Sequence, residues 1–373
     1  MNTKKLHIVS FDNPFPPVYG GVIDVFYKIK ALHEIGFEIF LHCIVDDDVA
    51  PSEELIAITN TVMFYKRNKS ANALKLLSQK PFAAVSRYNS DLVKNLEMNN
   101  FPILFEGLQS TYLLQKHNFS NRKLYLRLHN IESNYFAGSY KSERNPIKKV
   151  LYGLEARKYE KYQQIIERFD AVFTLSISET EFVQSQFQNA SYVPVFHGNS
   201  EPKKLSEFGD YAFYHGDLRL PDNKRAVGFL IDIFAAIPNV NFVIASGLKT
   251  EEIALQISDY PNIKYCEFEK QEELDVLLEN AHVNVMMSFQ ESGTKLKLVN
   301  ALYKSRFCLV NKNMADDPKL LDLCTIAETK SEFTESVQAL TKLPYRDCEN
   351  RKVALESILN DVENATKIAE IIG

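Results

Sequence analysis

Apolar segments of strand length that alternate with helical patterns constrain the fold of this chain more than any other feature of its sequence. Leu6 to Ser10 predicts a short buried strand, and the apolar residues from Val22 to Leu32 recur at helical spacing until Gly36 ends the helix. Phe37 to Val45 predicts a second strand. Because a strand, a helix and a second strand in succession form a crossover connection, the first half predicts a parallel sheet.

The same alternation recurs in the second half. The predicted strands are Tyr211 to Tyr214, Val240 to Ala245, Val283 to Met287 and Phe307 to Val310. Helical patterns lie between them at Asn223 to Ile237, Thr250 to Asp259, Lys270 to Glu279 and Thr294 to Tyr303. The second half therefore also predicts a doubly wound α/β fold.

The chain length predicts two domains, because 373 residues exceed the usual size of a single core. Periodicity is lost from Phe196 to Lys204, where residues typical of linkers gather. We therefore predict a Rossmann-like domain at 1–198 and a second Rossmann-like domain at 199–350. A C-terminal helix at 351–373 is expected to pack back toward the first domain.

The charge and cysteine content exclude several classes of protein. A formal net charge of -5 and a pI of about 6.0 leave no global positive field for nucleic acid. No apolar run has the length of a signal-peptide core or a membrane span. The five cysteines are scattered and never in C-x-x-C spacing, which argues against a disulfide framework and a zinc site. We expect a reduced, cytoplasmic protein whose cysteines are small core residues.

A strand, a short polar loop and an amphipathic helix follow one another from Met286 to Leu302. Ser292, Gly293 and Thr294 place small residues at the expected helix N-terminus, where unpaired backbone N–H groups and the helix dipole favour a phosphate. Lys295 adds a full positive charge. The alternative is that Ser292 or Thr294 is only the helix N-cap and Gly293 only a turn residue.

Four segments together resemble a known family. Residues 292–302, S-G-T-K-L-K-L-V-N-A-L, resemble the GSGT(R/K)LK-x-LEA loop of retaining GT-B glycosyltransferases of the GT4-like (glycosyl transferases group 1) family. Gly20 and Gly21 resemble the family's P-x-x-G-G loop. Residues 127–132 resemble its R-x-H-N-V-E segment, and residues 214–223 resemble the first strand and loop of its second domain. The resemblance spans nearly the whole chain.

This resemblance implies an α/β fold of the GT-B type, with two doubly wound, Rossmann-like domains that face a central cleft. It implies transfer of a sugar from a nucleotide-sugar donor to a hydroxyl of a saccharide or lipid-linked acceptor, with retained configuration. The nucleotide sugar is a substrate, so no cofactor and no metal are expected. The first domain would present the acceptor, and amides and cations of the second domain would hold the donor diphosphate.

The predicted donor site departs from the family pattern at the ribose. Where the family has a ribose-binding Glu, this chain has Asn300, which can bond a hydroxyl but lacks the charge that strengthens such a bond. Glu291 lies nine residues before Asn300, one more than the family's E-x7-E spacing. We name Glu291 as a catalytic candidate on this resemblance, and Ser292 to Lys295 and Asn300 as donor-binding candidates.

The predicted diphosphate contacts also depart from the pattern. By register from Gly216, the Arg and Lys of many members would fall on Asp217 and Asn223. Arg219 and Lys224 lie nearby, and a small shift of the loop would bring them to the diphosphate. Arg219 and Lys224 are therefore our candidates for the diphosphate contacts. The alternative is that they only lie on a solvated loop and at the start of a helix, without a ligand.

His129 is the candidate for contact with the donor sugar. The matching family histidine reaches the sugar near the reacting carbon, where it bonds a hydroxyl or steadies developing charge. Gly20 and Gly21 would close over the sugar with it. Arg127 is expected to support His129 or to contact an anion.

Other chemistries fit the sequence less well. Asp46, Asp47 and Asp48 resemble the metal-binding D-x-D motif of the other glycosyltransferase fold. That fold has no second Rossmann-like half, which argues against it here. Three acidic residues at a strand end also favour a solvated loop. No G-x-S-x-G elbow indicates a Ser-His-Asp hydrolase. A nucleotide-sugar epimerase of GT-B fold stays open, and Asn300 keeps a catalytically weak GT-B partner subunit open.

Residues 139–168 form a charged, Tyr-rich stretch. Its lysines and arginines would suit an anionic membrane or a lipid-linked acceptor, giving peripheral contact at the inner face of the membrane. Glutamates are interspersed among these positive charges, so a solvated helix is the favoured prediction.

Overall fold

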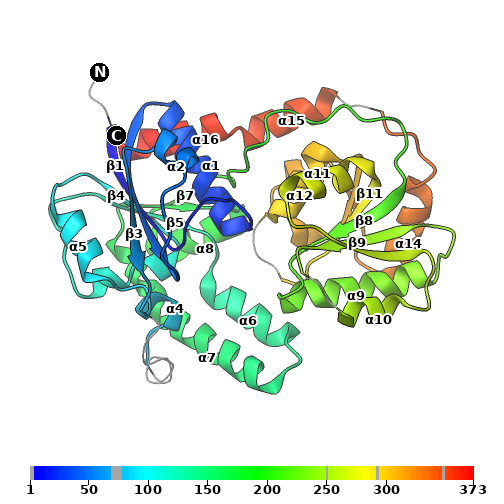
Figure 1. The fold of residues 1–373 in the computed structure, drawn as a ribbon, viewed down its shortest axis with the longest axis horizontal. Helices are drawn as coiled ribbons and strands as arrows, with labels where there is room; N and C mark the ends of the chain where they lie inside the picture. Colours follow the sequence, from blue (N-terminus) through cyan, green and yellow to red (C-terminus); the bar gives the residue numbers. More distant parts are fainter. Residues whose placement is uncertain (1–3, 69–77, 249–250, 291–293, 347–348) are drawn as a thin grey trace. The chain divides into compact units, whose positions relative to one another are not determined.

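The computed structural model describes residues 4–68, 78–248, 251–290, 294–346 and 349–373. The chain divides into two compact units (Figure 1). The first contains Met1–Ala137, Val150–Gly198 and Leu359–Gly373, and the second contains Gly138–Lys149 and Asn199–Ile358. Within the described residues, no helix combines the length and apolar character needed to cross a membrane.

The described part of the first unit is built on a seven-stranded parallel sheet in the order β3-β2-β1-β4-β5-β6-β7. Its strands are β1 (Lys4–Ser10), β2 (Phe37–Val45), β3 (Thr61–Lys66), β4 (Ile103–Glu106), β5 (Leu124–Leu128), β6 (Ala171–Thr174) and β7 (Ala190–Tyr192). β1 and β4 are neighbours although two strands separate them in sequence, so the direction of winding reverses between them.

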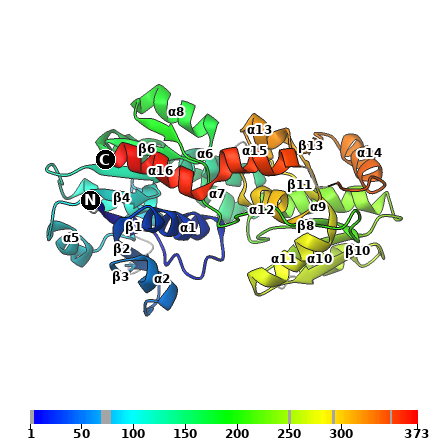
Figure 2. The same ribbon diagram turned by 90° about the horizontal axis from the view of Figure 1, so that it is seen from above.

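Helices connect these strands and cover both faces of the sheet. They are α1 (Gly20–Glu34), α2 (Glu53–Ile58), α4 (Phe82–Val85), α5 (Ser90–Glu97), α6 (Glu132–Ser142), α7 (Pro146–Tyr162), α8 (Ile177–Phe187) and α16 (Asp361–Ile372), with 3-10 turns at Leu108–Ser110, Tyr112–Gln115 and Gln163–Arg168. The segment Gly138–Lys149, which holds the end of α6 and the start of α7, belongs to the second unit. One core cluster holds residues of α5, α7 and α8, and the other holds residues of α1 and α16. Both views show α16 beside α1 (Figures 1 and 2).

The described part of the second unit contains a six-stranded parallel sheet in the order β10-β9-β8-β11-β12-β13. Its strands are β8 (Tyr211–His215), β9 (Phe242–Ser246), β10 (Ile263–Glu267), β11 (Ala281–Met286), β12 (Phe307–Val310) and β13 (Thr325–Ile326). Here the reversal of winding falls between β8 and β11.

The second sheet is also covered on both faces, with α9 and α10 on one side and α11 and α12 on the other (Figure 1). Its helices are α9 (Pro221–Ala235), α10 (Glu251–Ile257), α11 (Gln271–Asn280), α12 (Leu296–Lys304), α13 (Pro318–Leu321), α14 (Lys330–Leu340) and α15 (Glu349–Leu359), with a 3-10 turn at Lys312–Met314. Strands buried on both faces read as continuous apolar runs, which explains why the sequence marks them clearly.

The predicted fold class, two doubly wound Rossmann-like sheets, is confirmed. The predicted strands and helices of the second half agree with the observed elements to within a few residues at each end. The segment predicted as one C-terminal helix is instead two helices, α15 and α16, separated at Asn360, whose side chain accepts hydrogen bonds from the first turn of α16. Of these two helices, α16 belongs to the first unit.

Candidate functional site

In the first unit, the position at which a ligand is expected is the end of the sheet where β1 meets β4. Ligands of open parallel sheets bind beyond the carboxyl ends of the strands, at the reversal of winding. β1 ends at Ser10, β4 at Glu106 and β5 at Leu128, and α1 begins at Gly20. The candidate site of the first unit is built from these four element ends.

Gly20 and Gly21, the predicted donor contacts of this unit, begin α1. A Cβ atom on Gly21 would lie 2.8 Å from Cζ of Phe11, so packing already explains a glycine there. A Cβ atom on Gly20 would meet no described atom within 4 Å, and Gly20 is exposed. The backbone of Gly20 is therefore accessible, as the predicted contact requires.

One turn further along α1, a cluster of fully buried charges begins. Lys28 Nζ donates to Glu106 Oε2 at 2.7 Å and to Asp24 Oδ2 at 3.2 Å. Arg127 donates from Nε and Nη2 to the two carboxylate oxygens of Asp24, at 3.0 and 2.6 Å. All four side chains are fully buried. Since a buried charge is costly unless it is paired, each member holds the others in position.

The ionisation of Asp24 follows from these contacts. Burial by itself raises the pKa of Asp24, but the charges of Arg127 and Lys28 outweigh burial and hold that pKa well below its ordinary value. Asp24 is therefore a carboxylate at any pH near neutrality. It serves as the fixed negative centre of the cluster.

His129, the predicted sugar contact, lies at the edge of this cluster. Its Nε2 lies 3.0 Å from Glu106 Oε2, and the ring of Phe11 packs edge-on at 5.3 Å. A carboxylate oxygen accepts in this contact and His129 Nε2 donates, so a neutral His129 ring would leave Nδ1 as an acceptor. The His129 side chain is 6% exposed, whereas Glu106 has no exposed surface. Glu106 therefore orients a histidine that can accept from a hydroxyl.

Arg127, which the sequence left as a support or an anion contact, is a support in the structure. Besides Asp24, it donates to the carbonyls of Val193 and Pro194, at 2.6 and 3.0 Å. Asp24 Oδ1 also accepts from the backbone N–H of Phe196 at 2.9 Å. The pair thus ties the chain that leaves the first sheet to α1, and the guanidinium is fully buried.

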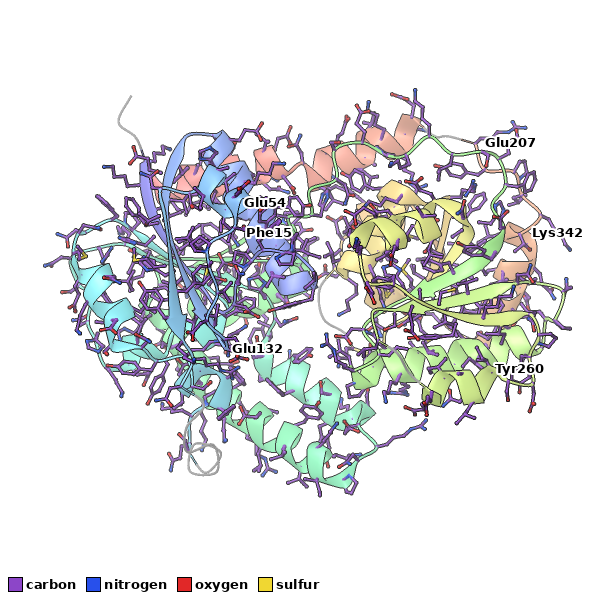
Figure 3. All side chains as sticks on the ribbon, in the orientation of Figure 1. Phe15, Glu54, Glu132, Glu207, Tyr260 and Lys342 are labelled. Carbon is purple, nitrogen blue, oxygen red and sulfur yellow. The ribbon has the colours of Figure 1, made fainter. Side chains whose placement is uncertain are left out.

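Glu132, the last residue of the R-x-H-N-V-E resemblance, begins α6 and is labelled in Figure 3. Burial, with a smaller contribution from Glu179, raises the pKa of Glu132 to about 8. Glu132 is thus mostly protonated at neutral pH. It differs in this respect from Asp24, whose burial is offset by two cations.

The three acceptor atoms of Asp24, Glu106 and His129 lie within 4.8 Å of one another, close enough to hold a metal ion. The ammonium of Lys28, at 2.7 and 3.2 Å from the two carboxylates, already supplies the positive charge that a metal would bring. We therefore assign no metal to this cluster. The predicted alternative at residues 46–48 is a surface loop, in which Asp48 pairs with Lys66 and Asp46 with Arg67.

The candidate site of the second unit lies at the reversal of winding between β8 and β11. The chain that follows β11 is fixed at its start, because Ser288 Oγ and the N–H of Phe289 donate to the two carboxylate oxygens of Asp222, at 2.8 and 3.0 Å. Asn311 exchanges two hydrogen bonds with the backbone of Ser288. These hydrogen bonds hold the backbone in place at the start of the loop that follows β11.

Only part of the predicted phosphate loop can be placed. Glu291, Ser292 and Gly293 lie outside the described residues. Thr294 Oγ1 is buried and has no hydrogen-bond partner among the described residues. Lys295 precedes the first residue of α12, and its N–H donates to the carbonyl of Met314 at 3.0 Å.

The predicted cations of this unit, Arg219 and Lys224, both pair with carboxylates on the surface. Arg219 donates from Nε and Nη2 to Asp217, at 2.8 to 3.0 Å, with its side chain 69% exposed. Lys224 Nζ lies 2.9 Å from Glu252. Their contact with a diphosphate stays a prediction that requires both pairs to open.

Asn300, the predicted ribose contact, is half-buried on α12. Its Oδ1 accepts from Asn199 Nδ2 at 3.2 Å. The side chain of Asn300 therefore has a protein partner, and its contact with a ribose stays a prediction.

Lys297 is the residue that sequence reasoning missed. Its Nζ donates to Asn223 Oδ1 at 3.1 Å and to the hydroxyl of Tyr214 at 3.3 Å, and it lies 4.7 Å from the centre of the Tyr214 ring. Within the described parts of the chain, no carboxylate lies within ion-pair distance of this ammonium. Lys297 is thus a cation with neutral partners.

The surroundings of Lys297 are poor in compensating charge. Burial lowers the pKa of Lys297 to about 8, with Asp222 acting in the opposite direction. His215, the last residue of β8, is buried beside it, and burial together with the charge of Lys297 lowers the pKa of His215 to about 3. His215 Nδ1 has no hydrogen-bond partner among the described residues. This end of the sheet therefore favours an anion electrostatically.

Comparison with solved structures shows the fold shared by this chain. Sucrose-phosphate synthase from Thermosynechococcus elongatus is similar over 99% of this chain and 98% of its own, with a TM-score of 0.71 and 13% identity. HepE from Anabaena, in complex with UDP-glucose, is similar over 98% of both chains, with a TM-score of 0.66 and 13% identity. The fold is GT-B.

A third GT-B structure with a similar fold is a TarM variant from S. aureus in complex with fondaparinux, alpha-GlcNAc-glycerol and UDP. The similarity covers 99% of this chain and 100% of the TarM chain, at a TM-score of 0.65 and 11% identity. No family model matches this sequence. A Klebsiella pneumoniae protein described as an uncharacterized 44.6 kDa protein in the cps region is 24% identical over 325 residues, 81% of each chain.

Within each GT-B unit, the structure brings predicted and unpredicted residues together. His129 and Arg127 join Asp24, Lys28 and Glu106, for which the sequence offered no signal, since Glu106 lies 78 residues from Lys28. For Lys297 a signal existed. It follows Thr294, the start of the predicted helix, by three residues, which is the spacing at which two side chains share one face of a helix.

Proposed function

We propose that this chain is a glycosyltransferase that moves a sugar from a nucleotide-sugar donor to a hydroxyl of a saccharide or lipid-linked acceptor. The observation that carries the proposal is Lys297, a half-buried cation with no carboxylate partner among the described residues, at the reversal of winding in the second sheet of a GT-B fold. Similar structures, those of TarM with UDP and of HepE with UDP-glucose, support the proposal.

In this proposal, the second unit binds the donor diphosphate. Lys297 supplies a charge-assisted contact, and the Thr294 hydroxyl and the backbone amides at the start of α12 supply hydrogen bonds. Negative charge develops on the diphosphate as the glycosidic bond breaks and the sugar carbon becomes oxocarbenium-like. A cation and amides held in advance stabilise that charge without a metal ion.

The first unit contributes His129 to the donor sugar, as the resemblance implies. Glu106 holds Nε2, so Nδ1 is the atom that accepts from a sugar hydroxyl. Retained configuration follows from the same resemblance. An epimerase would need a carboxylate to move a proton, but Asp24 and Glu106 are both engaged by cations, which favours the transferase.

The test begins with binding of nucleoside diphosphates to the full chain, measured by calorimetry with UDP first and the other bases after it. Lys297→Met is expected to weaken the best ligand about 10- to 100-fold, because one charge-assisted contact is lost. Lys304→Met is the matched control on α12, since Lys304 is occupied by Asp275 at 2.7 Å. Equal affinity of wild type and Lys297→Met would remove the phosphate role of Lys297.

The second part of the test follows the sugar. Incubation with a panel of nucleotide sugars is expected to give slow donor hydrolysis without acceptor and a new glycoside with retained configuration when an acceptor is supplied. A changed sugar on an intact nucleotide would identify an epimerase. Binding without turnover of any donor would identify a catalytically weak partner subunit.

A further inference from the structure

Two cysteines of the second unit meet where β12 and β13 lie side by side. β12 pairs with β13 in parallel, with Leu309 opposite Thr325. The same register continued one residue back along both chains places Cys308 opposite Cys324, on one face of the sheet. Neighbouring strands lie about 4.8 Å apart, and a disulfide joins Cα atoms about 4.4–6.8 Å apart. The backbone spacing therefore suits a bond between these two cysteines.

The two thiols are free and in contact with each other. Neither Cys308 nor Cys324 is in a disulfide, and their side chains share a hydrogen bond. The Cys324 thiol also donates to the carbonyl of Leu320 at 3.4 Å. Cys308 is 3% exposed, whereas Cys324 is half-buried. Cys324 is therefore the member of the pair that solvent reaches.

A buried cation lies beside the two thiols. Arg351 of α15 is 7% exposed and donates to neutral acceptors, the carbonyls of Arg306 and Ala301 and the hydroxyl of Tyr345. Its Nε has no hydrogen-bond partner, and among the described residues no carboxylate lies within ion-pair distance of its guanidinium. Because a buried cation is costly without an opposite charge, this site favours a negative charge on the thiol pair.

The contact between the thiols and the charge of Arg351 act together on their ionisation. The hydrogen bond with Cys324 lowers the pKa of Cys308, and Arg351 acts in the same direction against burial. The hydrogen bond with Cys308, together with burial, raises the pKa of Cys324 well above its ordinary value. The pair thus loses one proton more readily than it loses the second. These contacts favour a state in which two sulfurs share a single proton.

We propose that Cys308 and Cys324 form a reversible disulfide when the chain meets hydrogen peroxide. Transfer of the shared proton to Cys308 leaves Cys324 as a thiolate, which attacks one oxygen of the peroxide. The O–O bond breaks, hydroxide leaves, and Cys324 becomes a sulfenic acid. The Cys308 thiol then attacks the sulfenic sulfur, so that the S–S bond forms, the S–O bond breaks, and the departing hydroxide takes the thiol proton. Two electrons pass to the peroxide, and the products are the disulfide, one water and one hydroxide.

A metal ion fits the two sulfurs less well than a disulfide does. Among the described residues, no third histidine, cysteine or carboxylate joins this pair in a cluster that could hold a metal. The guanidinium of Arg351 beside the thiols would also repel a metal ion. Both observations favour covalent pairing of the sulfurs.

The inference goes beyond the proposed sugar transfer and is tested without it. The reduced full chain is exposed to hydrogen peroxide, its remaining thiols are blocked, and it is digested with trypsin without reduction. Cleavage after lysine and arginine places the two cysteines in peptides 307–312 and 320–330. Mass spectrometry is expected to find these two peptides linked, and dithiothreitol should separate them.

Cys266 is the internal control for reactivity. It is half-buried like Cys324, but burial raises its pKa and no second cysteine is in contact with it among the described residues. The linked peptides are expected to appear at least about tenfold faster than Cys266 is oxidised. Equal rates would mean that the pair has no special reactivity, which would overturn the inference.

Two variants test the roles within the pair. Arg351→Gln removes the charge and is expected to slow disulfide formation roughly tenfold, with Arg346→Gln at an exposed arginine as the matched control. Cys308→Ser removes the second thiol, so that a sulfenic acid should accumulate on Cys324, where dimedone traps it. Far-ultraviolet circular dichroism checks that each variant is folded, and the Cys308→Ser result stands whether or not Arg351→Gln folds.

Three further outcomes would overturn the inference. The first is wild type in which peptides 307–312 and 320–330 stay unlinked under peroxide. The second is a link of either peptide to Cys348, which lies outside the described residues, or a link found only in covalent dimers on a non-reducing gel. The third is a Cys308→Ser variant whose Cys324 takes up no dimedone. Disulfide formation at the wild-type rate in folded Arg351→Gln would remove Arg351 from the proposed reaction.

Discussion

The two units place charged residues at the same position in their sheets but treat the charges differently. In the first unit, Asp24 and Lys28 lie at the reversal of winding with every charge paired to an opposite one. In the second, Lys297 has only neutral partners among the described residues. Paired buried charges hold a geometry, whereas an ammonium without a carboxylate keeps its charge available for an anion. The first arrangement suits orientation of His129, and the second suits binding of a diphosphate.

The largest expected effect comes from breaking a pair in the first unit. Arg127→Met leaves Asp24 with one cation fewer and frees two backbone carbonyls, so the free energy of unfolding should fall by about 3–5 kcal/mol. Urea unfolding measures this change. A loss below about 1 kcal/mol would show that the cluster does not hold the first unit together.

Removal of the cation in the second unit should act in the opposite direction on stability. The native pKa of Lys297 is lowered to about 8, below the ordinary value for lysine. Between these two pKa values the native state binds fewer protons than the unfolded state, so the free energy of unfolding rises with pH in that range. At neutral pH the lysine is charged in both states, and burial of this charge lowers the free energy of unfolding. Lys297→Met should therefore leave the free energy of unfolding unchanged or raise it by about 1 kcal/mol, while diphosphate affinity falls. Urea unfolding and calorimetry on the same sample separate the two effects.

The pH dependence of diphosphate affinity sharpens this contrast. Affinity in wild type should fall as pH rises through about 8, by up to about tenfold per pH unit, as Lys297 loses its proton. Lys297→Met should show a flatter profile. Identical profiles would mean that another group supplies the charge.

Glu132 offers a smaller test within the first unit, because burial outweighs the opposing charge of Arg87 and raises its pKa. The native pKa of Glu132, about 8, lies above its unfolded pKa. Between these two pKa values the native state binds more protons than the unfolded state, so the free energy of unfolding falls as pH rises through this range. Glu132→Gln should remove a slope of up to about 1.4 kcal/mol per pH unit between about pH 5 and 8. Chemical unfolding at several pH values measures the slope, with Glu181→Gln on the exposed side of α8 as the control.

The smallest effect is expected for Arg219, whose pair with Asp217 is on the surface. Arg219→Ala should change the free energy of unfolding by less than about 1 kcal/mol, because solvent screens an exposed pair. Diphosphate affinity should change far less than in Lys297→Met, as measured by the same calorimetry. An equal loss in both variants would restore Arg219 as a main phosphate contact.

The fold was predictable from the sequence because its signals are local. The strand of residues 37–45 and the helix before it show their periods within a few residues of chain, and crossover connections then require a parallel sheet. The two helices at the C-terminus were merged into one because Asn360 can be read either as a helical residue or as a cap. Its hydrogen bonds to Val362 and Glu363 decide for the cap.

The candidate site was predictable only in part. His129 and Arg127 were found because they lie in one short segment that resembles a family motif, whereas Glu106 was not found because nothing near it in sequence marks it. Arg219 was proposed from proximity in sequence, but Asp217, two residues away, takes its guanidinium. Proximity along the chain is a poor guide to which cation remains available.

The sequence by itself determined the first strand-helix-strand unit, the alternation of strands and helices in the second half, and the division into two α/β halves. These depend on local periodicity and turn residues. Tertiary structure alone decided that Glu106 meets Lys28 and that Lys297 meets Tyr214, which is 83 residues away in sequence. The physical reason is that pairing and exposure depend on which distant residues the fold brings together, and no local pattern records them.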